Sequence, residues 1–179
     1  MAPDSDDSPQ TVVVMGVSGS GKTTVAQGIA NALGWEFAEG DDFHPAANKA
    51  KMASGHPLTD EDRWPWLRSI AAWIDAQTAK GRSSVVTCSA LRRTYRQLLL
   101  DNRRLRFCEL DAPQELIAQR LAERQGHYMP ASLLDSQIAT LEPLQPDEPG
   151  VRISVADTPD QIVAHALEAL GLTAKDRSS

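Results

Sequence analysis

The sequence predicts an α/β fold in which helices cover both faces of a five-stranded parallel sheet. Short apolar runs without polar alternation are typical of strands buried on both faces, and TVVVM at 11–15 is the clearest of them. These runs alternate along the chain with longer helical segments, as they do in βαβ units. Glycines and unusual polar residues gather just after the strands, which is the edge where such sheets bind ligands.

In the first half of the chain, expected strands are followed by expected helices. The elements expected there are a strand at 11–15, a helix at 22–33, a strand at 35–38, a short helix at 46–53 and a long helix at 60–79. Gly34 and Gly81 stand where a helix needs a left-handed residue to end. The long helix has one apolar face, made of Trp66, Leu67, Ile70, Trp73 and Ile74.

The second half continues the same alternation. Its expected elements are a strand at 83–90, a helix at 91–101, a strand at 104–110, a helix at 111–125, a short helix around 133–141, a strand at 151–155 and a last helix from 158. Asp111 and Thr158 each begin a capping-box pattern, with Pro in the first turn and Gln three residues later. We expect one domain over 11–172, between a disordered tail at 1–10 and a second tail at 173–179.

Composition excludes several classes of protein. The net charge of −6 over 179 residues argues against a general nucleic-acid binder. Cys88 and Cys108 both lie in apolar runs, which predicts buried thiols in a reducing compartment. No metal-ligand spacing, signal peptide or membrane span is evident, so we expect a cytoplasmic protein with no membrane or nucleic-acid partner.

A phosphate-binding loop follows the first strand. Gly16, Gly21, Lys22 and Thr23 fit the pattern G-x-x-x-x-G-K-[ST]. Its glycines let backbone N–H groups face phosphate oxygens, and the following helix adds its dipole. Lys22 is expected on the β- and γ-phosphates, and the Thr23 hydroxyl on Mg²⁺. The expected ATP-binding residues of this loop are Gly16, Val17, Ser18, Gly19, Ser20, Gly21, Lys22, Thr23 and Thr24.

Features that would favour other phosphate-loop proteins are missing from the sequence. The guanine-binding pattern N-K-x-D has only an incomplete match at 48–51, and the third strand ends in Cys88-Ser89 rather than an acidic residue. The chain is also short for a motor or translocase. A small phosphotransferase is therefore favoured, although the loop alone does not decide this.

The stretch at 39–66 supplies groups suited to an acceptor. Asp41 comes directly after the second strand, where a carboxylate can orient a hydroxyl and accept its proton. Arg63 suits a substrate carboxylate because its guanidinium can bind in a fork. The acids at 60–62 are interpreted instead as solvated helix-capping residues, and one of them as a surface partner for Arg63 in the alternative interpretation.

Four stretches together closely resemble the gluconokinase family, and the resemblance runs from about Val12 to Leu172. They are GVSGSGKTT, GDDFHPAANKAKMASGHPLTDEDRWPWL, CSALRRTYRQLL and RQGHYMPASLLDSQIATLEPL. The family consists of small kinases similar in fold to adenylate kinase and shikimate kinase. The resemblance implies ATP- and Mg²⁺-dependent phosphorylation of D-gluconate at its 6-hydroxyl, in a homodimer. It implies a three-layer P-loop kinase fold with a substrate-side insertion at about 40–60 and a mobile lid at about 120–149.

The resemblance also implies roles for single residues. Lys22, Asp41, Arg120 and Arg124 would be catalytic, with Asp41 the base. The two arginines lie four apart on one helical face at the start of the lid, and Arg120 with Pro159 would also contact ATP. The substrate-binding residues would be Asp41, His44, Lys51, Arg63, Arg92 and His127. Arg92 departs from the family pattern, in which lysine commonly follows C-S-A-L.

The sequence leaves alternatives open. The acceptor could be another small acid or polyol such as shikimate, and a nucleoside monophosphate kinase is less favoured. From a different class, the chain could be an ATP-binding regulatory module with vestigial catalysis; the presence of Lys22, Thr23 and Asp41 opposes this. A basic cluster at 92–106 resembles a nucleic-acid patch but has few aromatic residues, so surface charge is the better interpretation.

Overall fold

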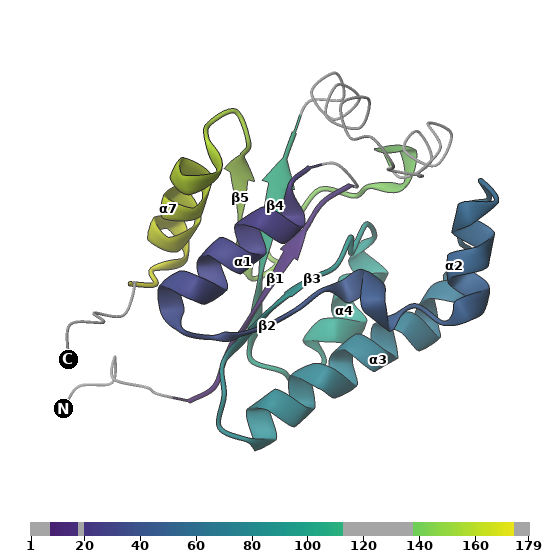
Figure 1. Cartoon of the computed structure of the whole chain (residues 1–179), viewed down its shortest axis with the longest axis horizontal. Coiled ribbons are helices and arrows are strands. Elements are labelled where there is room, and N and C mark those ends of the chain that lie inside the picture. The colour runs from purple at the N-terminus through teal and green to yellow at the C-terminus, as the bar shows by residue number, and fades with distance from the viewer. Residues whose placement is uncertain (1–7, 18–19, 113–137, 174–179) are drawn as a thin grey trace.

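The computed structural model describes residues 8–17, 20–112 and 138–173 (Figure 1). The strands are β1 (Thr11–Met15), β2 (Glu36–Ala38), β3 (Ser84–Thr87), β4 (Leu105–Asp111) and β5 (Gly150–Ser154). The helices are α1 (Lys22–Leu33), the short 3₁₀ helix η2 (Gly40–Phe43), α2 (Ala46–Ala53), α3 (Asp60–Ala79), α4 (Arg93–Leu100) and α7 (Pro159–Leu170).

The described strands form one parallel sheet in the order β2-β3-β1-β4-β5. β1 is central, and its Val13 lies opposite Val86 of β3 on one side and Phe107 of β4 on the other. Because all five strands run in one direction, their carboxyl ends meet at a single edge. The loops that carry the expected site residues therefore begin side by side.

Helices cover both faces of the sheet, as predicted (Figure 1). Val12 and Val14 of β1 pack into a core cluster with α1 and α7, whereas Val13 and Met15 pack into a second cluster with α3 and α4. Successive side chains of a strand point to opposite faces, so a strand between two helical layers must be apolar throughout. This explains why TVVVM shows no alternation. The result is a three-layer α/β fold.

Local signals set most helix ends where the sequence predicts them. Gly34 ends α1 with φ 70°, and Thr158 begins α7 in a capping box closed by Gln161. A second capping box at α3, between Thr59 and Asp62, confirms that Asp62 is a capping acid. Each such cap satisfies backbone N–H groups that the helix itself leaves open.

The region after β3 differs from the prediction. The strand ends at Thr87 rather than at residue 90, and α4 begins at Arg93 rather than at residue 91. Ala90 has φ 45°, a left-handed conformation that neither strand nor helix accommodates, and its carbonyl accepts a hydrogen bond from Arg96 at 2.9 Å. The turn was hidden in the sequence because it contains no glycine or proline.

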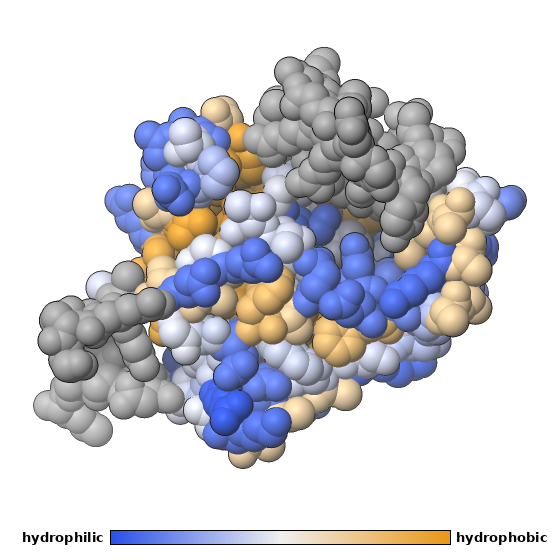
Figure 2. All heavy atoms as spheres, in the orientation of Figure 1, coloured by the Kyte–Doolittle hydropathy of each residue, from blue (hydrophilic) through white to orange (hydrophobic). Residues whose placement is uncertain are grey.

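Other differences are smaller. Asp111 is the last residue of β4, and the helix it was expected to cap lies outside the described residues. Gln10, assigned to the N-terminal tail, donates its backbone N–H to Ser83 and accepts from Arg106. In the orientation of Figure 1, polar and apolar residues are interspersed over the visible surface (Figure 2). Within the described ranges, no helix is both long and apolar enough to cross a membrane.

Candidate active site

The phosphate loop joins β1 to α1. Gly16 and Gly21 have φ 146° and 93°, conformations that other residues rarely adopt. The Lys22 ammonium donates to the carbonyls of Gly16 and Val17, each at 3.0 Å, so the loop closes around the lysine. Ser20 donates to the carbonyl of Val17 at 2.7 Å. The loop thus ends at the amino terminus of α1, where the N–H groups of the first turn favour an anion.

Glu39 bridges the phosphate loop and the sheet, and sequence reasoning did not single it out. The Thr23 hydroxyl, at the start of α1, donates to Glu39 Oε2 at 2.5 Å. The Thr87 hydroxyl, at the end of β3, donates to Glu39 Oε1. The carboxylate therefore lies beside the residue expected to bind Mg²⁺. A usable signal was present, because Glu39 directly follows β2 at the ligand-binding edge.

Gly40 fixes the start of the acceptor stretch. A Cβ at this position would lie 1.8 Å from the carbonyl oxygen of Thr87, so only glycine fits. Its N–H donates to Thr87 Oγ1 at 2.9 Å, and its carbonyl accepts from the Trp66 indole at 2.8 Å. Asp41 comes next, exposed in η2. The expected base is thus held at the sheet edge by the backbone before it.

His44 is buried rather than solvated. Its ring stacks on Trp66 with centroids 4.1 Å apart, and Asn48 lies 3.2 Å from its Nδ1. Burial and the positive charges of Arg63 and Lys49 lower the pKa of His44 to about 4. The imidazole is therefore neutral at physiological pH. It can exchange hydrogen bonds with hydroxyl groups but does not supply a positive charge for a carboxylate.

Arg63 is linked to α4. Its guanidinium donates to the Tyr95 hydroxyl at 2.7 Å, and that hydroxyl donates to the Asp60 carboxylate. Burial, followed by the hydrogen bond to Asp60, raises the pKa of Tyr95, so the hydroxyl stays protonated. Among the described residues, Arg63 makes no ion pair with Asp60 or Glu61. The alternative interpretation of Arg63 as half of a surface ion pair is therefore wrong.

Lys51 and Arg92 occupy different settings. Lys51 donates to the Asp62 carboxylate at 2.6 Å, so this ammonium already has an anionic partner. Arg92 is exposed at the N-cap position of α4. Lys51 belongs to the acceptor stretch at 39–66 and Arg92 follows β3, but Arg63 is the cation whose charge acts on both His44 and Cys88.

Cys88 lies where the expected catalytic groups converge. It is buried at the end of β3, and burial raises the pKa of its thiol to about 12. The charges of Asp41, Lys22 and Arg63 also act on this thiol. The structure thus brings together the phosphate-loop lysine, the expected base and the expected carboxylate contact. The thiol itself is protonated and so is no nucleophile.

The remaining expected site residues divide into two groups. Those outside the described residues are Ser18, Gly19, Arg120, Arg124 and His127. Thr24 and Pro159 are described and exposed: Thr24 is in the first turn of α1, and Pro159 begins α7 just beyond the carboxyl end of β5. The first turns of both helices therefore lie at the ligand-binding edge.

Three arginines of the basic cluster pair with acids, and one of these pairs is buried. Arg93 pairs with Asp147, Arg103 with Asp75, and Arg96 with Glu148. The side chains of the last pair are only 1% and 6% exposed. The prediction of surface charge is wrong for Arg96, because its partner comes from a segment 52 residues away that the local sequence does not reveal.

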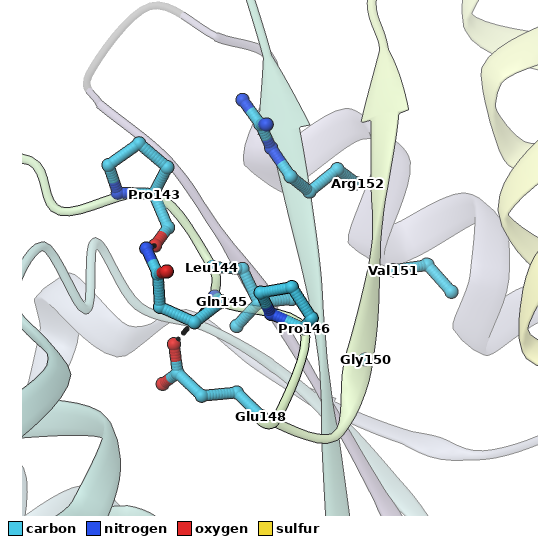
Figure 3. Close-up of a pocket in the computed structure, with 8 residues that line it drawn as sticks. All are labelled: Pro143, Leu144, Gln145, Pro146, Glu148, Gly150, Val151 and Arg152. Atoms are coloured by element: carbon cyan, nitrogen blue, oxygen red, sulfur yellow. Dashed lines mark hydrogen bonds between the residues drawn. The ribbon is translucent and has the colours of Figure 1, made fainter.

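A cavity of about 440 Å³ lies between the segment 143–148 and β5 (Figure 3). Arg152 at its border donates to the buried Glu109 carboxylate at 2.7 Å, which also accepts from the backbone of Leu144. None of the residues that line this cavity is among the expected catalytic or binding residues, although the segment 143–148 falls within the expected lid.

Together, the parallel sheet, the loop around Lys22 and the carboxylates of Glu39 and Asp41 define a small P-loop phosphotransferase. A family model described as an AAA domain matches residues 12–144. The gluconokinase of Gluconobacter oxydans (strain 621H) is 52% identical over 156 residues, covering 87% of this chain and 88% of that protein. The chain belongs to the gluconokinase family.

Solved structures give the same family. A sugar kinase from Janibacter sp. HTCC2649 matches with a TM-score of 0.88 at 54% identity, over 92% of this chain and 95% of that one. A gluconokinase from Sinorhizobium meliloti 1021 matches with a TM-score of 0.81 at 42% identity, over 92% of this chain and 93% of that one.

Proposed function

We propose that this protein transfers the γ-phosphate of ATP to the 6-hydroxyl of D-gluconate. The observation that carries the proposal is that Lys22 in the phosphate loop and Asp41 directly after Gly40 lie at the same edge of the sheet, with Arg63 close enough for its charge to act, as theirs do, on the Cys88 thiol. Lys22 suits a phosphate, Asp41 can accept a hydroxyl proton, and Arg63 suits a carboxylate. Membership of the gluconokinase family supplies the substrate.

Each residue has one task in the proposed transfer. Lys22 neutralises charge on the β- and γ-phosphates as the bond to the leaving ADP oxygen breaks. Asp41 orients the 6-hydroxyl and takes its proton as the new O–P bond forms. Arg63 holds the substrate carboxylate in a charge-assisted pair. His44, neutral and buried, hydrogen-bonds the hydroxyl groups between these two ends.

Magnesium fits the residues beside the phosphate loop. The Thr23 hydroxyl and the Glu39 carboxylate offer hard oxygen donors, which Mg²⁺ prefers. Among the described residues, no group of three or more His, Cys, Asp or Glu side chains could hold a metal by itself. The ion would therefore arrive with the nucleotide phosphates, as Mg²⁺ does in kinases. When bound, it would neutralise charge that develops on the transferring phosphoryl group.

The expected lid and the expected adenine contacts complete the proposal. Arg120 and Arg124 would contact the phosphates and adenine as a lid at about 120–149 closes, with His127 toward the substrate. Pro159 would border the adenine. A cytoplasmic homodimer, with a domain over 11–172, extends the proposal; size-exclusion chromatography with light scattering distinguishes a dimer from a monomer.

An acceptor panel tests the proposed function. Release of ADP from MgATP is measured with D-gluconate, shikimate or glucose, and without acceptor. Gluconate should give the highest kcat/KM, shikimate tests a different acid, and glucose tests a polyol without a carboxylate. Preference for shikimate would support the alternative function, a kinase for another small acid. No acceptor-dependent ADP release from folded protein would instead favour a regulatory ATP-binding module.

A further inference from the structure

The Tyr95 hydroxyl stands between two opposite charges of the same helix. It accepts a hydrogen bond from Arg63 at 2.7 Å and donates one to Asp60. A phenol has one proton to donate and lone pairs to accept with, so these two bonds satisfy it. The Asp60 carboxylate and the Arg63 guanidinium are thus separated by two consecutive hydrogen bonds.

Without this hydroxyl, the two charges would be natural partners. Asp60 and Arg63 lie three residues apart on α3, a spacing that places side chains on one face. Arginine binds carboxylates in a bidentate pair when nothing intervenes. Such a pair would occupy the donors that Arg63 needs for a substrate. The tyrosine therefore prevents an internal ion pair at this position.

The tyrosine is well suited to hold the guanidinium in place. Tyr95 is 1% exposed, and its ring makes an edge contact with Trp64 at 5.5 Å between centroids. The Arg63 guanidinium carbon lies 5.3 Å from the centre of the same ring, within the range of a cation–π contact. One rigid side chain thus fixes Arg63 through both its face and its hydroxyl.

The other donors of Arg63 remain available. A guanidinium has five N–H groups, and only the bond to Tyr95 engages one of them within the part of the chain that the structure describes. The charge of Arg63 acts on His44 and Cys88, on the side of the expected site. The arrangement leaves a positioned cation whose charge reaches two residues of the expected site.

We propose that Tyr95 is a specificity-determining positioning residue, which holds Arg63 away from Asp60 so that the guanidinium can bind an anionic acceptor. The proposal rests on the proposed function of Arg63 as the carboxylate contact. It makes the selectivity for an acid over an uncharged polyol depend on the Tyr95 hydroxyl of α4.

Tyr95→Phe tests the positioning role, because the substitution keeps the ring and removes only the hydroxyl. Asp60 should then capture Arg63. KM for gluconate should rise about tenfold, the size expected for a lost charge-assisted contact. KM for ATP should stay within about twofold, and turnover of glucose, if measurable, should not fall. An unchanged KM for gluconate, or an equal rise in both KM values, would overturn the proposal.

A second substitution separates capture by Asp60 from a general structural effect. Asp60→Asn alone should behave like the parent protein, because the amide oxygen still accepts from Tyr95. Asp60→Asn combined with Tyr95→Phe should restore most of the gluconate affinity, because no carboxylate remains to bind Arg63. A double variant as weak as Tyr95→Phe would contradict the proposal. Melting temperatures of all variants identify loss of fold.

Arg63→Ala distinguishes failure of the positioning role of Tyr95 from failure of the proposed carboxylate contact of Arg63. If Arg63→Ala raises KM for gluconate and Tyr95→Phe does not, the positioning role fails and the proposed carboxylate contact stands. If Arg63→Ala leaves KM for gluconate unchanged in folded protein, both fail, and Lys51, Arg92 or His127 becomes the anchor. A rise with both variants, reversed by Asp60→Asn in the Tyr95→Phe background, supports both.

Discussion

The Thr23 hydroxyl donates its proton to Glu39 Oε2 at 2.5 Å, so the lone pairs of that hydroxyl point elsewhere. A hydroxyl that binds a cation does so through a lone pair, and its proton then needs an acceptor. Glu39 is that acceptor, and Thr87 holds the carboxylate from its other oxygen. Glu39, directly after β2, is thus the carboxylate beside the proposed magnesium position, although β3 ends without an acid.

Glu39→Gln should change how ATP binding depends on Mg²⁺. Removing the negative charge weakens MgATP binding, expected at about tenfold for one charge-assisted contact, and does not weaken binding of ATP in EDTA. The difference between the two affinities should therefore shrink. Isothermal titration calorimetry with and without Mg²⁺ measures both values.

Glu36→Gln is the matched control for this charge. Glu36 is exposed at the beginning of β2 and pairs with Arg82, away from the ligand-binding edge. The Glu36→Gln substitution removes the same charge from the same region of the chain and should leave the affinities for MgATP and for metal-free ATP unchanged. An equal weakening of MgATP and metal-free ATP in Glu39→Gln would show that Glu39 supports the loop and not the metal.

Asp41→Asn should lower kcat by two to four orders of magnitude, which is the usual range for a lost general base. The amide keeps the shape but does not accept the hydroxyl proton. Affinity for ATP should change little. Asp42→Asn, at the neighbouring exposed position, is the control and should keep kcat. A collapse of ATP affinity with kcat retained would make Asp41 a nucleotide ligand.

Lys22→Ala should fold normally and lose most phosphoryl transfer. Lys22 is only partly buried and donates to two carbonyls of its own loop, so we expect stability to depend on it little. The charge on the transferring phosphoryl group, by contrast, then lacks its counter-charge. Steady-state turnover with MgATP and gluconate, alongside a thermal melt, checks both parts. Near-normal turnover would reject the assignment of the loop.

The buried imidazole of His44 should make stability depend on pH. Its pKa is about 4 when folded against 6.5 ordinarily, so the unfolded chain binds more protons between these values. Stability should therefore fall as the pH drops from about 6.5 to about 4, by on the order of 3 kcal/mol in full. The Lys51 hydrogen bond lowers the pKa of Asp62 to about 2, which places its own contribution at lower pH.

His44→Phe removes this titration and keeps a ring against Trp66. Urea unfolding at several pH values should show a flatter profile between pH 6.5 and 4 for the variant than for the parent. Parallel profiles would show that the imidazole is not held neutral by the fold.

Local patterns predicted the framework because its elements can be recognised from neighbouring residues. The glycine after α1 and the capping box at Thr158 act on adjacent backbone, and the apolar run of β1 is visible in five consecutive residues, although distant helices bury it. The phosphate loop was predictable for the same reason, because the residues that define it are contiguous, from Gly16 to Thr23.

The contacts that position the site were not predictable because their partners come from distant segments. Glu39 meets Thr87 across 48 residues, and Arg63 meets Tyr95 across 32. In sequence, Asp60 looks like any capping acid, and only the fold places a phenol beside it. Asp41 and His44 were expected as site residues, but the neutrality of His44 follows from burial against Trp66, which periodicity does not reveal.

The most direct test of the central claim is to identify the product. Purified protein is incubated with MgATP and D-gluconate, and the mixture is followed by ³¹P and ¹³C NMR. We predict that ADP and a single phosphomonoester, whose phosphorus couples to C6 of the sugar acid, form in equal amounts. Free phosphate in place of the sugar phosphate, or an ester at another carbon, would contradict it.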